Sequence, residues 1–177
     1  MPSSQENLRN LLKIGQIKAE PPDQAEFNGL VMAASNRLGD AENSALRTDS
    51  RFSLSYDAAH GLALAALRWH GYRSEHRYTV FQALPHTLSI STSKWRSLDD
   101  CHHKRNVAIF EGDLSADEPM IDELIAVAKE LLSAAKALPP IEKLNGPWRL
   151  GCAAHITVGH VPRSVGGQPL LRYIFYV

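Results

Sequence analysis

The spacing of its apolar residues constrains this chain more than any other feature. From Glu6 to Leu138 these residues recur mostly at steps of three and four, which is the period of an α-helix with one buried face. The sequence therefore predicts a mainly α-helical protein. The clearest stripe consists of Ile121, Leu124, Ile125, Ala128, Leu131, Leu132, Ala135 and Leu138.

Local signals place the ends of six expected helices. Polar capping residues and helix-ending Gly or Pro residues separate one apolar stripe from the next. The third helix is apolar nearly all round between Ala58 and Leu67, so it is expected at the centre of the fold. The expected helices are a short one around Leu8 to Leu12 that ends before Pro21, a second from its cap Asp23 to about Leu46, a third from Asp49 or Ser50 to His70, a fourth from His76 to Leu84 before Pro85, a fifth from Ser93 to Gly112, and a sixth that starts with the capping box Ser115 to Glu118.

The composition changes at a pair of prolines that follow the last helical stripe. Residues 1–138 are expected to form the helical domain, and residues 139–177 a C-terminal appendage. Within the appendage, residues 153–158 and 170–177 have the pattern of two strands separated by Pro and Gly, which favours a β-hairpin. Because an isolated hairpin is barely stable in water, this tail must dock on the helices or be poorly ordered.

Charge and cysteine content narrow the function classes. The chain of 177 residues has 19 Lys and Arg against 19 Asp and Glu, so any nucleic-acid contact must come from a local cluster rather than from an overall positive field. The two cysteines lie far apart, the first residues lack the apolar core of a signal peptide, and no later apolar run is long enough to span a membrane. A cytoplasmic protein with reduced thiols and no membrane partner is therefore expected.

A local cluster of basic residues lies on the fifth expected helix. At 100° per residue, Leu98, His102, Arg105 and Ile109 fall along one stripe, and Arg105 projects almost where Leu98 does. A guanidinium on an apolar stripe costs several kcal/mol if it is desolvated without a partner. Arg105 is therefore expected to pair with a carboxylate, to border a cleft or to face another subunit.

Three segments of the helical region carry a family resemblance. SYDAAHGLALAALRWHGYR (residues 55–73), HRYTVFQALPH (76–86) and KRNVAIFEG (104–112) resemble the HEPN superfamily of bacterial helical domains, and the resemblance covers residues 5–138. It implies an antiparallel helical bundle, commonly a homodimer, with the Arg-Asn element of the last-but-one helix facing a cleft at the dimer interface. Many members are metal-independent ribonucleases or toxins, often encoded beside a small nucleotidyltransferase, and others are non-catalytic.

The catalytic branch of that family is marked by Arg followed, after four to six residues, by His. Counted from Arg105, the His would stand at Phe110, Glu111 or Gly112, so it is absent. A literal match from Arg96 to His102 exists, but about one or two such pairs arise by chance in a chain of this composition. His102, one turn before Arg105, is the nearby substitute.

The leading interpretation is a non-catalytic HEPN-type module that binds RNA, a nucleotide or a partner protein in a defence or toxin-antitoxin setting. Arg105 would hold phosphate or pin a dimer, and Asn106 would hydrogen-bond across the cleft. The flanking contributors are Lys104 and His102, with Tyr56 and Glu111 completing the network. Two alternatives stay open, a metal-independent RNA endonuclease that uses His102 and Arg105, and a structural homodimerisation module in which Arg105 pairs internally.

No metal or cofactor is expected. Cys101, His102 and His103 are consecutive, and consecutive helical residues point 100° apart, so they cannot converge on one tetrahedral ion. His60 lies within the central apolar helix and is expected as a hydrogen-bonded core histidine. Cys101 is expected as a packed thiol, because nothing in the sequence indicates a lowered pKa.

Overall fold

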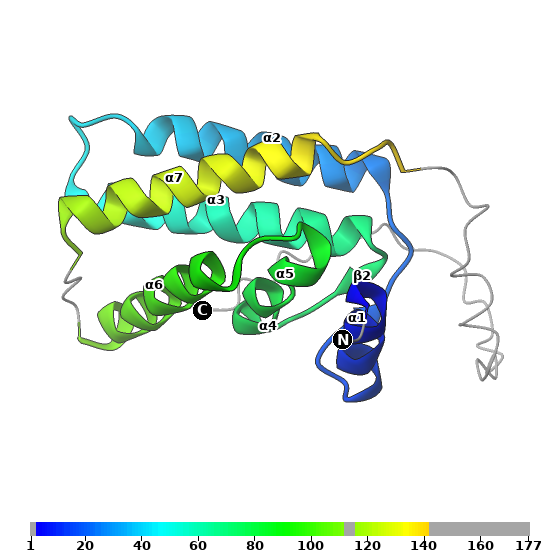
Figure 1. Cartoon of the computed structure of the whole chain (residues 1–177). Coiled ribbons are helices and arrows are strands. Elements are labelled where there is room, and N and C mark those ends of the chain that lie inside the picture. Colours follow the sequence, from blue (N-terminus) through cyan, green and yellow to red (C-terminus); the bar gives the residue numbers. More distant parts are fainter. Residues whose placement is uncertain (1–2, 112–115, 142–177) are drawn as a thin grey trace, which may run out of the picture. The chain divides into compact units, whose positions relative to one another are not determined.

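The computed structural model describes residues 3–111 and 116–141, with the side chains of 109–111 outside the description. These residues belong to one compact unit, Met1–Lys143, and they confirm the prediction of a mainly α-helical fold (Figure 1). The predicted hairpin in residues 139–177 lies almost wholly outside the described part. The described elements are α1 Ser4–Lys13, β1 Lys18–Ala19, α2 Gln24–Ala41, α3 Thr48–Trp69, β2 Tyr72–Arg73, α4 Arg77–Gln82, α5 Leu84–Thr87, α6 Thr92–Glu111 and α7 Glu118–Lys136.

Helix α3 is the centre of the unit, as its composition predicts. It contacts α2, α6 and α7, and its Ala59, Leu62, Ala63 and Ala66 side chains are fully buried. The alanines let neighbouring helices approach closely while still removing apolar area from water. Helices α2 and α6 run opposite to α3 and α7, so the four long helices form an antiparallel arrangement (Figure 1).

The predicted C-terminal end of the second helix and the predicted N-cap of the sixth are wrong, and in both cases a short polar side chain decides the boundary. Helix α2 begins after its predicted cap Asp23 but ends at Ala41 rather than near Leu46. The Asn43 side chain there accepts a hydrogen bond from the Ala45 backbone N–H at 3.0 Å, which offers the chain a turn in place of another helical step. Helix α7 is capped by Asp117, whose carboxylate accepts from the Met120 N–H at 3.0 Å, and so the cap is not the predicted Ser115.

Helix α5 and strands β1 and β2 have no clear signal in the sequence. The fourth predicted helix ends at Gln82, and a second short helix, α5, carries Pro85 in its first turn, where the missing N–H costs nothing. Strands β1 and β2 pair antiparallel over two residues each and tie the segment after α1 to the segment after α3. Gly71, at φ +82°, turns the chain from α3 into β2.

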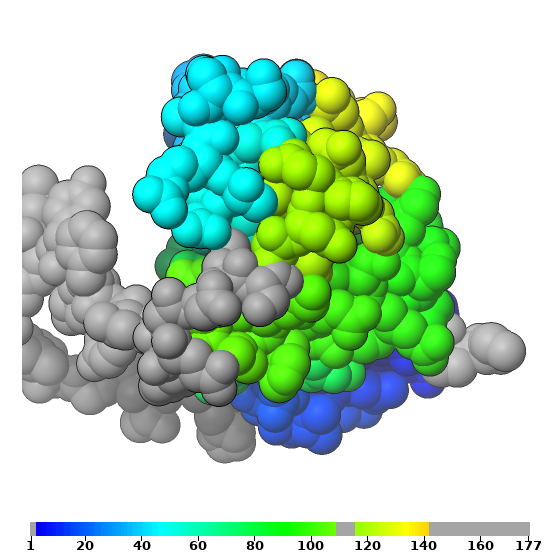
Figure 2. Space-filling view, turned by 90° about the vertical axis from the view of Figure 1, so that its left-hand side faces the viewer, coloured from blue at the N-terminus to red at the C-terminus, as the bar shows by residue number. Residues whose placement is uncertain are grey.

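A buried arginine near each end of α3 binds that end to neighbouring segments through hydrogen bonds and ion pairs. At its start, Arg51 donates from Nε to the Ala41 carbonyl at 3.0 Å and pairs with Glu118, and Asp122 lies 3.5 Å away. Figure 2 shows this end of the unit, where the turn between α2 and α3 (cyan) lies next to the first turns of α7 (yellow-green). At the other end, Arg68 is only 2% exposed.

Arg68 holds a group of acceptors on the segment that leads into α2. Its Nη2 lies 2.7 Å and its Nε 3.0 Å from Glu26 Oε2, so the pair is a two-pronged contact with one carboxylate oxygen. The same guanidinium donates to the backbone carbonyls of Glu20 at 3.1 Å and Pro21 at 2.9 Å. The exposed Arg73 on β2 reaches Glu26 as well, at 2.6 Å. These contacts hold α3 and β2 to α2 and to the segment that precedes it.

Candidate functional site

Helix α6 carries most of the predicted site residues, and its packing decides which way they face. Leu98 and Cys101 are buried at 0% and 3% exposure and pack into the core. Because His102 and Arg105 follow Leu98 at helical steps, they stand at the edge of this buried stripe and are half-buried. Lys104, on the outer side of the helix, is exposed.

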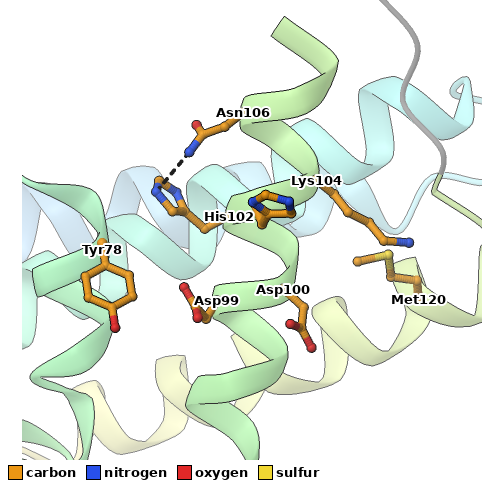
Figure 3. A pocket seen from close by; sticks show the side chains of 8 residues that line it. Tyr78, Asp99, Asp100, His102, Lys104, Asn106 and Met120 are labelled. Atoms are coloured by element: carbon orange, nitrogen blue, oxygen red, sulfur yellow. Dashed lines mark hydrogen bonds between the residues drawn. The ribbon is translucent and has the colours of Figure 1, made fainter. Parts of the chain in front are cut away.

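His102 is held on both of its ring nitrogens. Nδ1 lies 2.7 Å from the Tyr56 hydroxyl of α3, and Nε2 lies 3.1 Å from Asn106 Nδ2, one turn further along α6 (Figure 3). In this orientation the Asn106 amide donates, so Nε2 is the acceptor and Nδ1–H donates to the Tyr56 oxygen. Three of the predicted site residues therefore form one hydrogen-bonded chain from α3 to α6.

The environment keeps His102 neutral near pH 7. Burial lowers its pKa most, Asp99 opposes that shift, and the nearby charge of Arg105 lowers the pKa further. A neutral imidazole can accept one hydrogen bond and donate one, and this is the pattern that Tyr56 and Asn106 use.

Arg105 lies against an aromatic ring instead of a carboxylate. Its Cζ atom is 5.3 Å from the centroid of the Tyr56 ring, within the range of a cation–π contact. Among the residues with described side chains, no Asp or Glu lies within ion-pair distance of its guanidinium. The internal ion pair that was one expectation for Arg105 is therefore not formed within the described part of the chain.

A second guanidinium reaches the same ring and was not expected from the sequence. Arg77, the first residue of α4, places its Cζ atom 5.7 Å from the Tyr56 centroid and donates to Asp57 at 3.0 Å. Tyr56 and His60 stand four apart on α3 and so share a face, which is a signal that the sequence does contain. No spacing rule could bring Arg77 there, because its place depends on how α4 folds back on α3.

His60 belongs to the same junction. Its ring packs edge-on against Phe81, with 5.7 Å between ring centroids. Burial lowers the pKa of His60 to about 4, with the positive charge of Arg77 contributing and Asp57 opposing. His60 is thus a neutral, largely buried histidine beside the candidate site, at the edge of the core. The part of the expectation that gave it a hydrogen bond stays a prediction.

An open hollow runs over the outer face of α6 and is bordered by residues of α4 and α7 (Figure 3). It measures about 760 Å³ and mixes charges, since Asp99 and Asp100 stand beside Lys104. Tyr56 and Arg105 are not among the residues that line it. The lining residues are Tyr78, Asp99, Asp100, His102, His103, Lys104, Asn106 and Met120.

Two further expectations concern Glu111 and Cys101. The side chain of Glu111 lies outside the description, so its place in the network stays a prediction. Burial raises the pKa of the Cys101 thiol to about 12, with Glu123 and Asp100 adding to the rise, so this thiol is packed rather than activated. Within residues 3–108 and 116–141, no group of three or more His, Cys, Asp or Glu side chains is arranged to hold a metal ion.

Comparisons with known proteins return no relative. No family model, no curated protein and no solved structure matches the chain. The HEPN resemblance therefore stays a prediction that rests on the three segments quoted above. None of the described helices combines the length and the apolar character needed to cross a bilayer.

Proposed function

We propose that this chain is a non-catalytic, HEPN-type module that binds RNA or a nucleotide through phosphate contacts at α6. The observation that carries the proposal is the position of Arg105, whose charge is half-buried over Tyr56 with no carboxylate partner among the described side chains. A cation kept in such a place is available for an anionic ligand. Asn106 and the exposed Lys104 stand next to it on the same helix.

The hydrogen bonds of His102 support the non-catalytic form of this proposal. RNA cleavage without metal needs a base within about 3 Å of the attacking 2′-hydroxyl, with a nitrogen free to take its proton. Both nitrogens of His102 are occupied, by Tyr56 and by Asn106. Phe110, at the first position where the catalytic motif would place its histidine, has no titratable group.

A ribonuclease assay separates this proposal from the endonuclease alternative. Purified protein incubated with total RNA in EDTA is expected to leave the RNA intact over hours, as read on a denaturing gel. EDTA removes metal-dependent contaminants, so it isolates the metal-independent reaction that the resemblance would imply. Cleavage that disappears in both Arg105→Ala and His102→Ala variants would show instead that the protein is an endonuclease that uses these two residues.

Loss of the Arg105 charge is expected to weaken RNA binding by roughly ten- to a hundredfold, since hydrogen bonds to charged groups contribute about 1.5–3 kcal/mol. The measurement is the fluorescence anisotropy of a labelled single-stranded RNA titrated with the Arg105→Gln variant. Arg37→Gln is the matched control, because Arg37 is an exposed arginine on α2 and its replacement removes the same single positive charge. Equal losses in the two variants would mean that the wild-type contact is only a diffuse charge effect.

The resemblance also implies a homodimer and a nucleotidyltransferase partner, and both stay predictions. Sedimentation velocity of the full chain tests the first of them directly. If Arg105→Gln changes neither self-association nor RNA affinity, Arg105 only packs on Tyr56, and the structural homodimerisation alternative is favoured.

A further inference from the structure

Two guanidinium groups from different helices meet at one ring. Arg77 on α4 and Arg105 on α6 lie 5.7 Å and 5.3 Å from the Tyr56 centroid, and both are half-buried. A guanidinium charge in a partly desolvated place is unfavourable unless a counter-charge offsets the loss of hydration. One carboxylate, Asp57, contacts Arg77 at 3.0 Å, and among described side chains no carboxylate contacts Arg105.

The remaining polar groups of the junction suit an anion more than a cation. Both imidazoles there, His60 and His102, are neutral, and the charges of Arg77 and Arg105 contribute to lowering the pKa of each. The same two charges act on the Tyr56 hydroxyl, where they oppose the rise in pKa that burial causes. Both guanidinium charges therefore act on this hydroxyl, with Asp57 opposing them, and Asp99 is the carboxylate that acts on His102 from the α6 side.

We propose that the junction of α3, α4 and α6 is a site for a terminal phosphate group, gripped by Arg77 and Arg105 together. This rests on the proposed function and names the part of the RNA or nucleotide that the site takes. A guanidinium offers two parallel N–H donors that match phosphate oxygens, and two of them match the double charge of a phosphomonoester better than the single charge of an internal phosphodiester. A chain end also enters a half-buried junction more easily than a strand that must continue on both sides.

Two RNAs that differ in one group test the site. Single-stranded oligonucleotides of the same sequence, one with a 5′-phosphate and one with a 5′-hydroxyl, carry a 3′ fluorophore and are titrated with the full chain. The 5′-phosphate RNA is expected to bind at least roughly tenfold more tightly, because two charge-assisted contacts are added. That advantage should vanish in Arg77→Gln and in Arg105→Gln and persist in Arg37→Gln. Arg77→Lys keeps the positive charge but loses the two parallel N–H donors of the guanidinium. This variant should therefore keep part of the affinity advantage of the 5′-phosphate RNA.

The outcomes distinguish this site from the wider proposal. Equal affinity for the two RNAs, with binding retained, overturns the terminal-phosphate site and leaves an RNA-binding module. No binding of either RNA overturns both. An advantage that survives Arg77→Gln places the phosphate elsewhere and also overturns the site. Thermal melting of each variant shows whether it is folded, and the wild-type comparison of the two RNAs needs no variant at all.

Discussion

Replacing Arg68 with alanine is expected to lower the free energy of unfolding by about 3 kcal/mol, the lower part of the range for breaking one partner of a buried ion pair. Arg68 is 2% exposed and donates to Glu26 and to the carbonyls of Glu20 and Pro21. Removing it leaves these acceptors without their donor and opens a cavity between α3 and the segment that leads into α2. The expected loss of unfolding free energy is near the lower end of that range, because the Glu26 side chain is 31% exposed and water can partly replace the guanidinium.

Arg73 provides a matched control for this prediction. It contacts the carboxylates of Glu20 at 2.9 Å and Glu26 at 2.6 Å, and Arg68 also reaches both, with Glu20 Oε1 3.3 Å from its Nη2. The Arg73 side chain, however, is 44% exposed. Arg73→Ala is therefore expected to cost less than about 1 kcal/mol, as surface ion pairs do. Urea denaturation followed by circular dichroism measures both variants. Similar losses for the two arginines would mean that burial does not set the strength of this network.

The Arg68 contact also predicts how stability changes in acid. Its hydrogen bond holds the pKa of Glu26 below 4.5, against the opposing effect of burial. A carboxyl group with a depressed pKa in the fold contributes stability above its unfolded pKa, and that stability is lost as the pH falls through the folded value. The stability of the wild-type chain should therefore fall below about pH 4.5 more steeply than that of Arg68→Ala.

The long helices could be predicted from the sequence because each buries a stripe with a clear period. The stripe of α7 predicts a buried face, and Ile121, Leu124 and Leu131 are buried. Boundaries were less predictable, because Asn43 and Asp117 act through local hydrogen bonds that compete with equally plausible neighbours. Elements as short as β1 and β2 carry no periodic signal.

The candidate site also has a part that the sequence predicts and a part that it does not. Helical spacing alone places His102, Arg105 and Asn106 on one side of α6, and Tyr56, named from the sequence, lies against two of them. The position of Arg77 depends on the fold of α4 over α3, and no interval in the sequence specifies that. The partners of Arg68 could not be predicted either, because they come from a segment more than 40 residues earlier in the chain. The periodicity of the sequence predicts which side chains share one face of a helix. The packing of helices against one another decides which residues those side chains contact.

The stability of the chain is expected to fall by about 3 kcal/mol between pH 6.5 and pH 4 through His60 alone, since each pKa unit corresponds to about 1.4 kcal/mol. Burial lowers the pKa of this histidine from 6.5 to about 4 in the fold, so the unfolded chain binds the extra proton in that interval. The sign follows directly: stability is fully present above pH 6.5 and is lost as the pH falls toward 4. Protonation in the fold would place a third positive charge beside Arg77 and Arg105.

His60→Leu is expected to flatten this part of the pH profile, because leucine fills much of the space against Phe81 without a titratable group. The control is His103→Leu, which removes an exposed histidine from the outer face of α6 and should leave the profile unchanged. The free energy of unfolding is measured in urea at half-unit steps from pH 4 to pH 7.5. Burial and lowered pKa values at His70, His86 and His102 contribute in the same direction, so a residual slope is expected in His60→Leu. A slope in His60→Leu equal to that of the wild type would contradict the assignment of a neutral, largely buried His60.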